Sequence, residues 1–150
     1  MAREETQVLE AFLHRSVPLT KTMGIGVHRI DPSGIELGAP LAPNRNHFGG
    51  AFGGSIANLG LTAAWLLVHW RLSDRVPAPT VVIAEQRVVF ARPVLRALVA
   101  RAAMPDQASW RDFEGALERR GRGRIAMAAT VEGDGEVAAR FEGSFVATSG

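Results

Sequence analysis

Apolar residues recur along this chain at two spacings, and the changes between them predict where helices and strands begin. Residues 4 to 15 repeat apolar side chains at helical spacing, so we expect a short amphipathic helix that Pro18 helps to end. Segments 24–31 and 34–41 flank a turn signal around Pro32 and predict a strand pair. The chain therefore begins with a helix and two strands.

A longer apolar stretch follows the glycine-rich sequence NRNHFGGAFGGS at residues 44–55. Residues 54–72 are apolar on most faces, as expected of a helix covered on nearly all sides. Their densest part, residues 56–70, is 15 residues long, whereas a bilayer needs roughly 20. We therefore expect a buried core helix and no membrane span.

The remaining pattern is mostly that of strands. Residues 80–91 are β-branched and mostly apolar, residues 93–104 follow in similar style, and segments 123–132 and 136–148 flank an Asp-Gly turn. Between these pairs, residues 108–119 repeat apolar side chains at helical spacing. One central helix with about six strands predicts an α+β fold, a single domain over residues 1–150 whose antiparallel sheet wraps the helix.

The amino-acid composition limits the kinds of ligand and partner that we expect the protein to bind. The formal net charge is +2 and the sequence pI about 10.3, because nearly every base is an arginine. These arginines are scattered, which argues against a nucleic-acid surface but suits an anionic small molecule. Cysteine is absent and the four histidines lack ligand spacing, so we expect neither a metal nor another cofactor. The start of the chain lacks a signal peptide's apolar core, which favours a cytoplasmic protein without a membrane partner.

The glycine run permits more than one interpretation. It lacks the lysine of a phosphate-binding P-loop and the spacing of a dinucleotide fingerprint. Glycines in front of a helix could instead let an oxyanion approach unpaired backbone N–H groups. They could equally serve tight turns and close helix packing. Spacing alone leaves these last two interpretations open.

A family resemblance favours the oxyanion interpretation. The pattern of Asn46, Gly49, Gly53 and Gly54 before the helix SIANLGLTAAWLL resembles the loop and central helix of hot-dog-fold acyl-thioesterases. The block LAPNRNHFGGAFGGSIANLGLTAAW more closely resembles the YiiD carboxy-terminal-type thioesterase domains, and VVFARPV, GRGRI and GEVAARFEGSFVA extend the match over nearly the whole chain.

The resemblance implies a hot-dog fold and a homodimer or homotetramer with active sites at a subunit interface. It also implies thioester substrates carried by coenzyme A or acyl carrier protein, as in fatty acid metabolism.

This sequence departs from related thioesterase patterns at the positions that would supply the catalytic base. In phenylacetyl-CoA-type thioesterases, a histidine commonly precedes the final Gly-Gly and an acid lies further along the helix. Phe52 and Leu61 take those places here, and the expected helix carries no carboxylate. Either the base comes from elsewhere, or the protein is not a hydrolase of that type.

Several residues are candidates for catalysis. The N–H groups of Gly53 and Gly54 would polarise a carbonyl, and Asn46 would hold the carbonyl or a water, unless it only caps its own loop. His47 could act as a base or simply be exposed. Ser55 begins a polar stripe with Asn58 and Thr62, in which Thr62 is expected to bond back to a carbonyl one turn earlier.

Other candidates lie further along the chain. Only one of Glu85 and Gln86 can point towards the central helix, and Glu85 is the carboxylate that we favour if a second subunit supplies the base. The remaining candidates would bind substrate. Aromatic side chains would line an acyl chain, an amide side chain would contact the substrate, and arginines would bind the phosphates of coenzyme A or the acids of a carrier protein. These candidates are Phe48, Phe52, Asn58, Arg92, Arg122 and Arg124.

Three functions fit these observations. Acyl-thioester hydrolysis is the first. A malonyl-thioester decarboxylase would need the same oxyanion donors but no base to activate water. A non-catalytic acyl-thioester-binding protein would keep the pocket and lack turnover.

Overall fold

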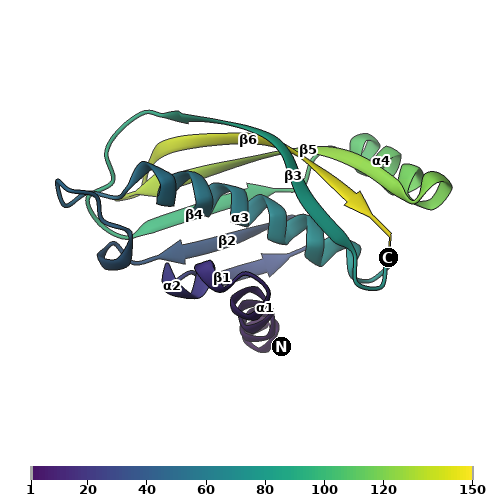
Figure 1. Cartoon of the computed structure of the whole chain (residues 1–150), viewed down its shortest axis with the longest axis horizontal. Helices are drawn as coiled ribbons and strands as arrows, with labels where there is room; N and C mark the ends of the chain where they lie inside the picture. The colour runs from purple at the N-terminus through teal and green to yellow at the C-terminus, as the bar shows by residue number, and fades with distance from the viewer. Residues whose placement is uncertain (1, 150) are drawn as a thin grey trace.

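The fold is a curved antiparallel sheet with one long helix lying across its inner face (Figure 1). The computed structural model describes residues 2–149. The strands are β1 (Gly26–Asp31), β2 (Gly34–Ala39), β3 (Thr80–Phe90), β4 (Leu98–Ala103), β5 (Arg122–Gly133) and β6 (Glu136–Thr148). They form a 6-stranded sheet in the order β1-β2-β4-β5-β6-β3.

Helix α3 (Gly53–Leu72) is the central helix. Its buried side chains include Leu59, Ala63, Leu66 and Leu67, which face sheet residues such as Phe141 in the same apolar core. The α+β fold with a sheet of about six strands around one long helix is therefore confirmed. None of the helices within residues 2–149 is both long and apolar enough to cross a membrane.

The other helices lie at the margins of this core. Helices α1 (Ala2–Ser16) and α2 (Pro18–Thr22) lie beside β1, and α4 (Gln107–Arg120) extends beyond the start of β5 (Figure 1). Pro18 does end α1, but it also begins α2, which the sequence pattern did not predict. The short 3-10 helix η1 (Ala42–Asn44) was missed as well.

One predicted strand starts later than expected. Residues 91–97 form a loop after β3, and β4 begins only at Leu98. The carbonyl of Val94 in this loop accepts a hydrogen bond from Ala51 N at 2.8 Å. An added Cβ on Gly50 would come within 3.2 Å of that carbonyl, so the close approach favours glycine there. The loop after β3 therefore packs against the glycine-rich segment that leads into α3.

Candidate active site

A buried amide anchors the segment in front of α3. Asn44 ends η1, and its side-chain Nδ2 donates to the carbonyls of Met23 (2.9 Å) and Pro40 (2.8 Å). Its own carbonyl accepts from Phe52 N at 2.7 Å. Asn44 therefore fixes where α3 begins. We did not select it from the sequence, where it was one polar residue among several in NRNH.

Asn46 closes the glycine loop on itself. Its Oδ1 accepts from Phe48 N at 2.9 Å and Gly50 N at 3.1 Å, and Asn46 N donates to the carbonyl of Gly50 at 2.6 Å. Gly49 has a φ of 88°, a conformation that glycine adopts without a steric cost. The structure thus shows the loop-capping role for Oδ1, which leaves the Nδ2 group as the part of Asn46 available to a ligand.

The start of α3 presents free backbone donors. At this end of the helix, the first N–H groups that donate a hydrogen bond are those of Ser55 (2.9 Å) and Ile56 (3.0 Å). Both donate to the carbonyl of Phe52. Gly53 and Gly54 donate no hydrogen bond within the described part of the chain. Gly53 is half-buried and Gly54 is exposed, so solvent reaches this end of the helix. The helix dipole and these donors together favour an electron-rich oxygen there.

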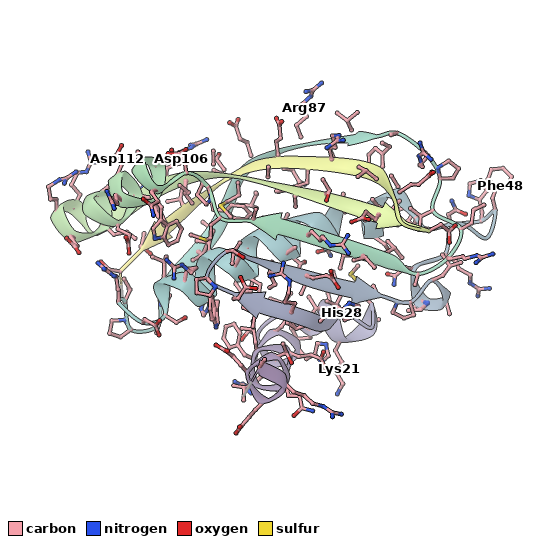
Figure 2. The ribbon with its side chains drawn as sticks, turned by 180° about the vertical axis from the view of Figure 1, so that it is seen from behind. Lys21, His28, Phe48, Arg87, Asp106 and Asp112 are labelled. Atoms are coloured by element: carbon pink, nitrogen blue, oxygen red, sulfur yellow. The ribbon has the colours of Figure 1, made fainter. Side chains whose placement is uncertain are left out.

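Aromatic rings flank these glycines. The side chain of Phe52 lies against Gly54, and the ring of Phe90 at the end of β3 lies 3.7 Å from where a Cβ of Gly53 would stand. Phe48 is 87% exposed at the outer tip of the loop (Figure 2). We expected Phe48 and Phe52 at this site but missed Phe90, because nothing in the sequence shows that the end of β3 meets the start of α3.

His47 lies on the same loop as Asn46. Its ring packs against that of Phe48, with centroids 4.1 Å apart, and the residue is exposed. His47 is therefore an exposed residue of the loop that carries Asn46, before the free N–H groups at the start of α3.

The polar stripe along α3 is largely satisfied by protein atoms. Thr62 is buried and donates to Asn58 Oδ1 at 2.8 Å, in place of the expected backbone carbonyl. Asn58 Nδ2 donates to the sulfur of Met23 at 3.4 Å. Ser55 is half-buried in the first turn, next to the free N–H groups. Of this stripe, Ser55 is the member closest to the candidate site along the helix.

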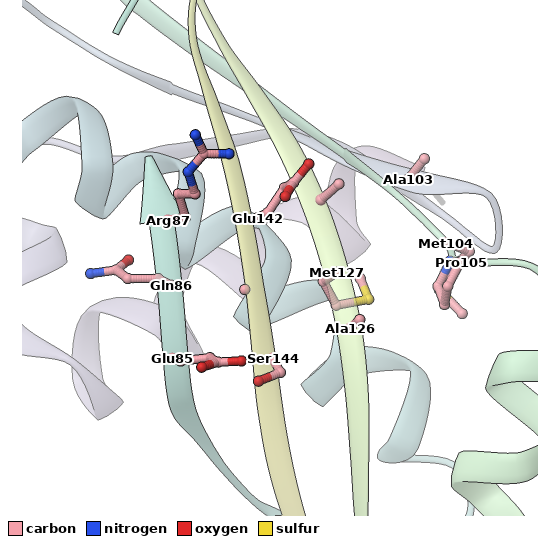
Figure 3. Close-up of a pocket in the computed structure, with 12 residues that line it drawn as sticks. Glu85, Gln86, Arg87, Ala103, Met104, Pro105, Ala126, Met127, Glu142 and Ser144 are labelled. Carbon is pink, nitrogen blue, oxygen red and sulfur yellow. The ribbon is translucent and has the colours of Figure 1, made fainter. Parts of the chain in front are cut away.

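Glu85 and Gln86 face opposite sides of the sheet. Gln86 is on the side of α3, two residues before Val88, which pairs with the buried Phe141. Glu85 is on the outer face, and Figure 3 shows its side chain turned to the opposite side from that of Gln86. Its carboxylate lies 3.4 Å from the guanidinium of Arg124. The structure does not bring Glu85 to the start of α3 within one protomer.

The three arginines that the sequence offered as candidates for binding substrate do not form one cluster. Arg92 follows β3, close to the glycine loop, and pairs with Glu136. Arg122 is at the far end of the sheet, where its strand partner Thr148 in turn pairs with Thr80. From Thr80 to Phe90 the strand extends roughly 33 Å. Arg124 also lies towards that far end, and donates to Ser144 Oγ at 2.7 Å.

Two further arginines lie near the loop, and neither was selected from the sequence. Arg45 immediately precedes Asn46, and Arg96 lies in the loop after β3, 3.6 Å from Asp134. Within residues 2–149, no group of three His, Asp or Glu side chains is arranged to hold a metal ion.

Comparison with known proteins identifies the family. The family described as "Putative thioesterase (yiiD_Cterm)" matches residues 6–149. The chain belongs to this thioesterase family. The resemblance stated from the sequence is thereby confirmed.

Solved structures support the same fold. A protein of unknown function from Chlorobaculum tepidum TLS is 25% identical, with a TM-score of 0.92, over 99% of this chain and 97% of the other. A putative thioesterase from Shewanella oneidensis is 24% identical, with a TM-score of 0.85, over 97% of this chain and 99% of the other. A thioesterase from Haemophilus influenzae is 17% identical with a TM-score of 0.77 over 96% and 90%. The fold is the hot-dog fold.

Proposed function

We propose that this protein hydrolyses acyl thioesters carried by coenzyme A or by an acyl carrier protein. The observation that carries the proposal is the pair of unbonded, solvent-reachable N–H groups of Gly53 and Gly54 at the start of α3. A thioester oxygen placed there would gain negative charge as water attacks the carbonyl carbon, and the two donors would stabilise that charge. The C–S bond then breaks, the thiolate takes a proton, and a carboxylic acid leaves.

Asn46 would act in this reaction as a donor. Because its Oδ1 already accepts from Phe48 N and Gly50 N, its remaining polar group is the Nδ2 amide. An N–H donor can hold the carbonyl oxygen or the oxygen of the attacking water. The same two bonds keep the loop in one shape, so Asn46 would both build the site and contact the substrate.

His47 is the base that we assign to the hydrolysis. Helix α3 carries no carboxylate, and Glu85 points to the opposite face of the sheet in its own protomer. His47 is in the same loop as Asn46 and is exposed to the solvent from which water arrives. An imidazole that accepts a proton from water near neutral pH fits this role.

Decarboxylation of a malonyl thioester is the second candidate, and the absence of a carboxylate along α3 favours it. In that reaction the bond to the carboxylate breaks, carbon dioxide leaves, and the electron pair moves to the thioester oxygen as an enolate. The N–H groups of Gly53 and Gly54 would hold the enolate oxygen until the carbon takes a proton. No base that activates water is needed.

The carrier would meet the arginines around the mouth of the site. Arg45, Arg92 and Arg96 are exposed in the two loops that contact each other through Ala51 and Val94. Guanidinium groups bind phosphates well, as in coenzyme A, and also pair with the acidic side chains of a carrier protein. Arg92 and Arg96 now pair with Glu136 and Asp134, so an anionic carrier would exchange with these acids.

The test is turnover by the purified protein on acyl thioesters of graded chain length on both carriers. Because the chain has no cysteine, free thiol from the substrate can be measured without a background from the protein. Release of carbon dioxide from malonyl-CoA without free thiol would favour the decarboxylase. Tight binding without either product would reject both reactions and favour a binding protein.

Variants at the loop separate its structural and chemical roles. Asn46→Asp keeps both acceptor contacts but loses the Nδ2 donor, whereas Asn46→Ala loses both. We expect both variants to lose at least about 100-fold in kcat/KM, the usual effect of removing an oxyanion donor, and only Asn46→Ala to lose thermal stability. Full activity in Asn46→Asp would mean that the role of Asn46 is limited to shaping its loop. His47→Ala should impair hydrolysis and leave decarboxylation intact.

A further inference from the structure

No side chain caps the start of α3. The residue at the N-cap position is Phe52, whose ring accepts no hydrogen bond from the first turn of the helix. Helix α4 is different, because the carboxylate of its N-cap residue Asp106 accepts from Ser109 N at 2.8 Å. A side-chain acceptor at Phe52 would take up an N–H group of the first turn of α3. The apolar N-cap keeps those donors free, so this end of the helix must be held in another way.

One backbone hydrogen bond from outside the helix holds it. The carbonyl of Asn44 accepts from Phe52 N at 2.7 Å. The carbonyl of Phe52 in turn accepts from the N–H groups of Ser55 and Ile56, so it points into the helix. The peptide bond between Phe52 and Gly53 is trans, and the N–H of Gly53 therefore points the opposite way, out of the end of the helix. The position of the Phe52 backbone thus sets the direction of a free donor.

Asn44 is itself fixed by its side chain. Its Nδ2 uses both hydrogens, which it donates to the carbonyls of Met23 (2.9 Å) and Pro40 (2.8 Å). The residue is only 2% exposed, although Pro43 and Arg45 on either side of it are exposed. Its Oδ1 is also buried and accepts no hydrogen bond within residues 2–149. The cost of that acceptor offsets part of what the two donor bonds contribute, so stability alone is a weak reason for asparagine at this position.

The anchor at Met23 is connected to α3 as well. Asn58, one turn after Gly54, donates from Nδ2 to the sulfur of Met23 at 3.4 Å. Thr62 donates to Asn58 Oδ1 at 2.8 Å, which fixes the orientation of the amide. Met23 therefore contacts Asn44 through its carbonyl and the second turn of α3 through its sulfur. The glycine-rich segment and the helix are held against the same residue.

We propose that Asn44 is a positioning residue for the thioester reaction, which holds the free N–H groups of Gly53 and Gly54 where negative charge develops. The inference rests on the proposed function, because those donors are the basis of that function. Asn44 does not touch the substrate, since its side chain is buried and both Nδ2 hydrogens are used. It acts through the N–H of Phe52. A misplacement of about 1 Å can lower a rate by about 100-fold, so the bond matters for hydrolysis and decarboxylation alike.

Phe52→Pro tests this bond directly. Phe52 has a φ of −65°, which is the value that proline imposes, so proline fits the backbone and removes the N–H that donates to Asn44. Phe52→Ala also loses the ring but keeps the N–H, so it is the matched reference. On a thioester that the wild type converts, we expect kcat of Phe52→Pro to be at least about tenfold below that of Phe52→Ala, with KM changed less than about twofold. Equal kcat values would overturn the proposal.

A double-mutant cycle tests whether Asn44 and Phe52 act together. Asn44→Ala loses both side-chain donors, and we expect kcat to fall at least about tenfold. If both residues act through one hydrogen bond, adding Asn44→Ala to Phe52→Pro should lower kcat no further, whereas adding it to Phe52→Ala should. Independent losses that multiply would overturn the proposal. Asp106→Ala removes the cap of α4 and is the control, which should lower the melting temperature and leave kcat unchanged.

Amide hydrogen exchange separates this inference from the proposed function. In Phe52→Pro and Asn44→Ala, the N–H groups of Ser55 and Ile56 should exchange at least about tenfold faster, while mid-helix amides such as that of Leu66 keep their protection. Unchanged exchange at Ser55 and Ile56 would overturn the positioning role whether or not the protein converts thioesters. Because Phe52 is exposed, Phe52→Pro carries this test even if Asn44→Ala does not fold. A wild type without turnover would instead refute the reaction, even where exchange showed that Asn44 holds the helix.

Discussion

Glycine serves different purposes at Gly53 and Gly60, although both are in the same helix. At Gly60 an added Cβ would lie 3.1 Å from Phe141 Cβ, inside the core. At Gly53 it would lie 3.7 Å from the exposed ring of Phe90, which is an ordinary contact. Close packing therefore requires glycine at Gly60 but not at Gly53. A site that needs bare backbone is a reason for glycine at Gly53 that packing does not provide.

Gly53→Ala should stabilise the protein and impair its activity. Alanine favours helix over glycine by about 0.5–1 kcal/mol, and nothing at this position blocks a methyl group. The methyl group would stand beside the free N–H groups, so we expect kcat/KM for thioesters to fall at least about tenfold. Thermal unfolding and thiol release measure the two effects.

Gly115→Ala in α4 is the matched control. Its added Cβ would meet only the flexible end of Arg119, at 2.9 Å, which can move aside. The same gain in stability is expected there with unchanged activity. If Gly53→Ala also kept full activity, the backbone at Gly53 would have no role in turnover.

At the scale of elements, Gly60 sets how closely α3 approaches β5 and β6. An alanine there would meet Phe141 at 3.1 Å and Val131 Cγ2 at 3.4 Å, and both neighbours are buried. Overpacking of this kind costs about 1–3 kcal/mol, which exceeds the gain in helix propensity. Gly60→Ala should therefore lower the free energy of unfolding in denaturant titrations by about 1–2 kcal/mol. Equal or higher stability would show that α3 can move away from the sheet at little cost.

The limits of α3 could be predicted from the sequence. Which β3 side chains point to each face of the sheet could not. The helix was expected from about Gly54 and begins at Gly53, because composition changes abruptly there. On β3, alternation counted from the buried Val81 would turn Glu85 towards the helix. The bulge at Ala84 shifts the alternation by one residue and turns Gln86 inward instead. A bulge depends on the pairing with β6, which one strand's sequence does not reveal.

The site residues that the sequence did not reveal come from elements far along the chain from the glycine loop. Phe90 and Arg96 reach the glycine loop because Val94 accepts a hydrogen bond from Ala51. These residues are far apart in sequence, and no local pattern links them. By contrast, the loop and the start of α3 are contiguous. Their residues, from Asn46 to Ser55, could therefore be selected together from the sequence.

For the molecule as a whole, a half-buried histidine adds to the contacts by which the buried Leu9 and Leu13 of α1 join the N-terminal helix to the core. The ring of His69 near the end of α3 stacks on Phe12 of α1, with centroids 4.6 Å apart, and on Trp65 at 5.4 Å. Trp65 in turn donates to the carbonyl of Val81 in β3 at 2.7 Å. This stack therefore connects α1, α3 and the edge strand, so its protonation affects the stability of the fold.

Stability should accordingly fall in mild acid through His69. Burial lowers the pKa of His69 from the ordinary value of 6.5, because the charged ring loses solvation. Well above pH 6.5 the ring is neutral in both folded and unfolded chains, and the contribution is complete. As the pH falls from 6.5 towards the lower folded-state pKa, the unfolded chain binds the proton more readily, and stability is lost. His69→Phe keeps an aromatic ring but cannot titrate, so its melting temperature, followed from pH 8 to pH 5, should decline less than that of the wild type. Parallel curves over this range would mean that the stack tolerates a charged ring, and that α1 remains attached in acid for another reason.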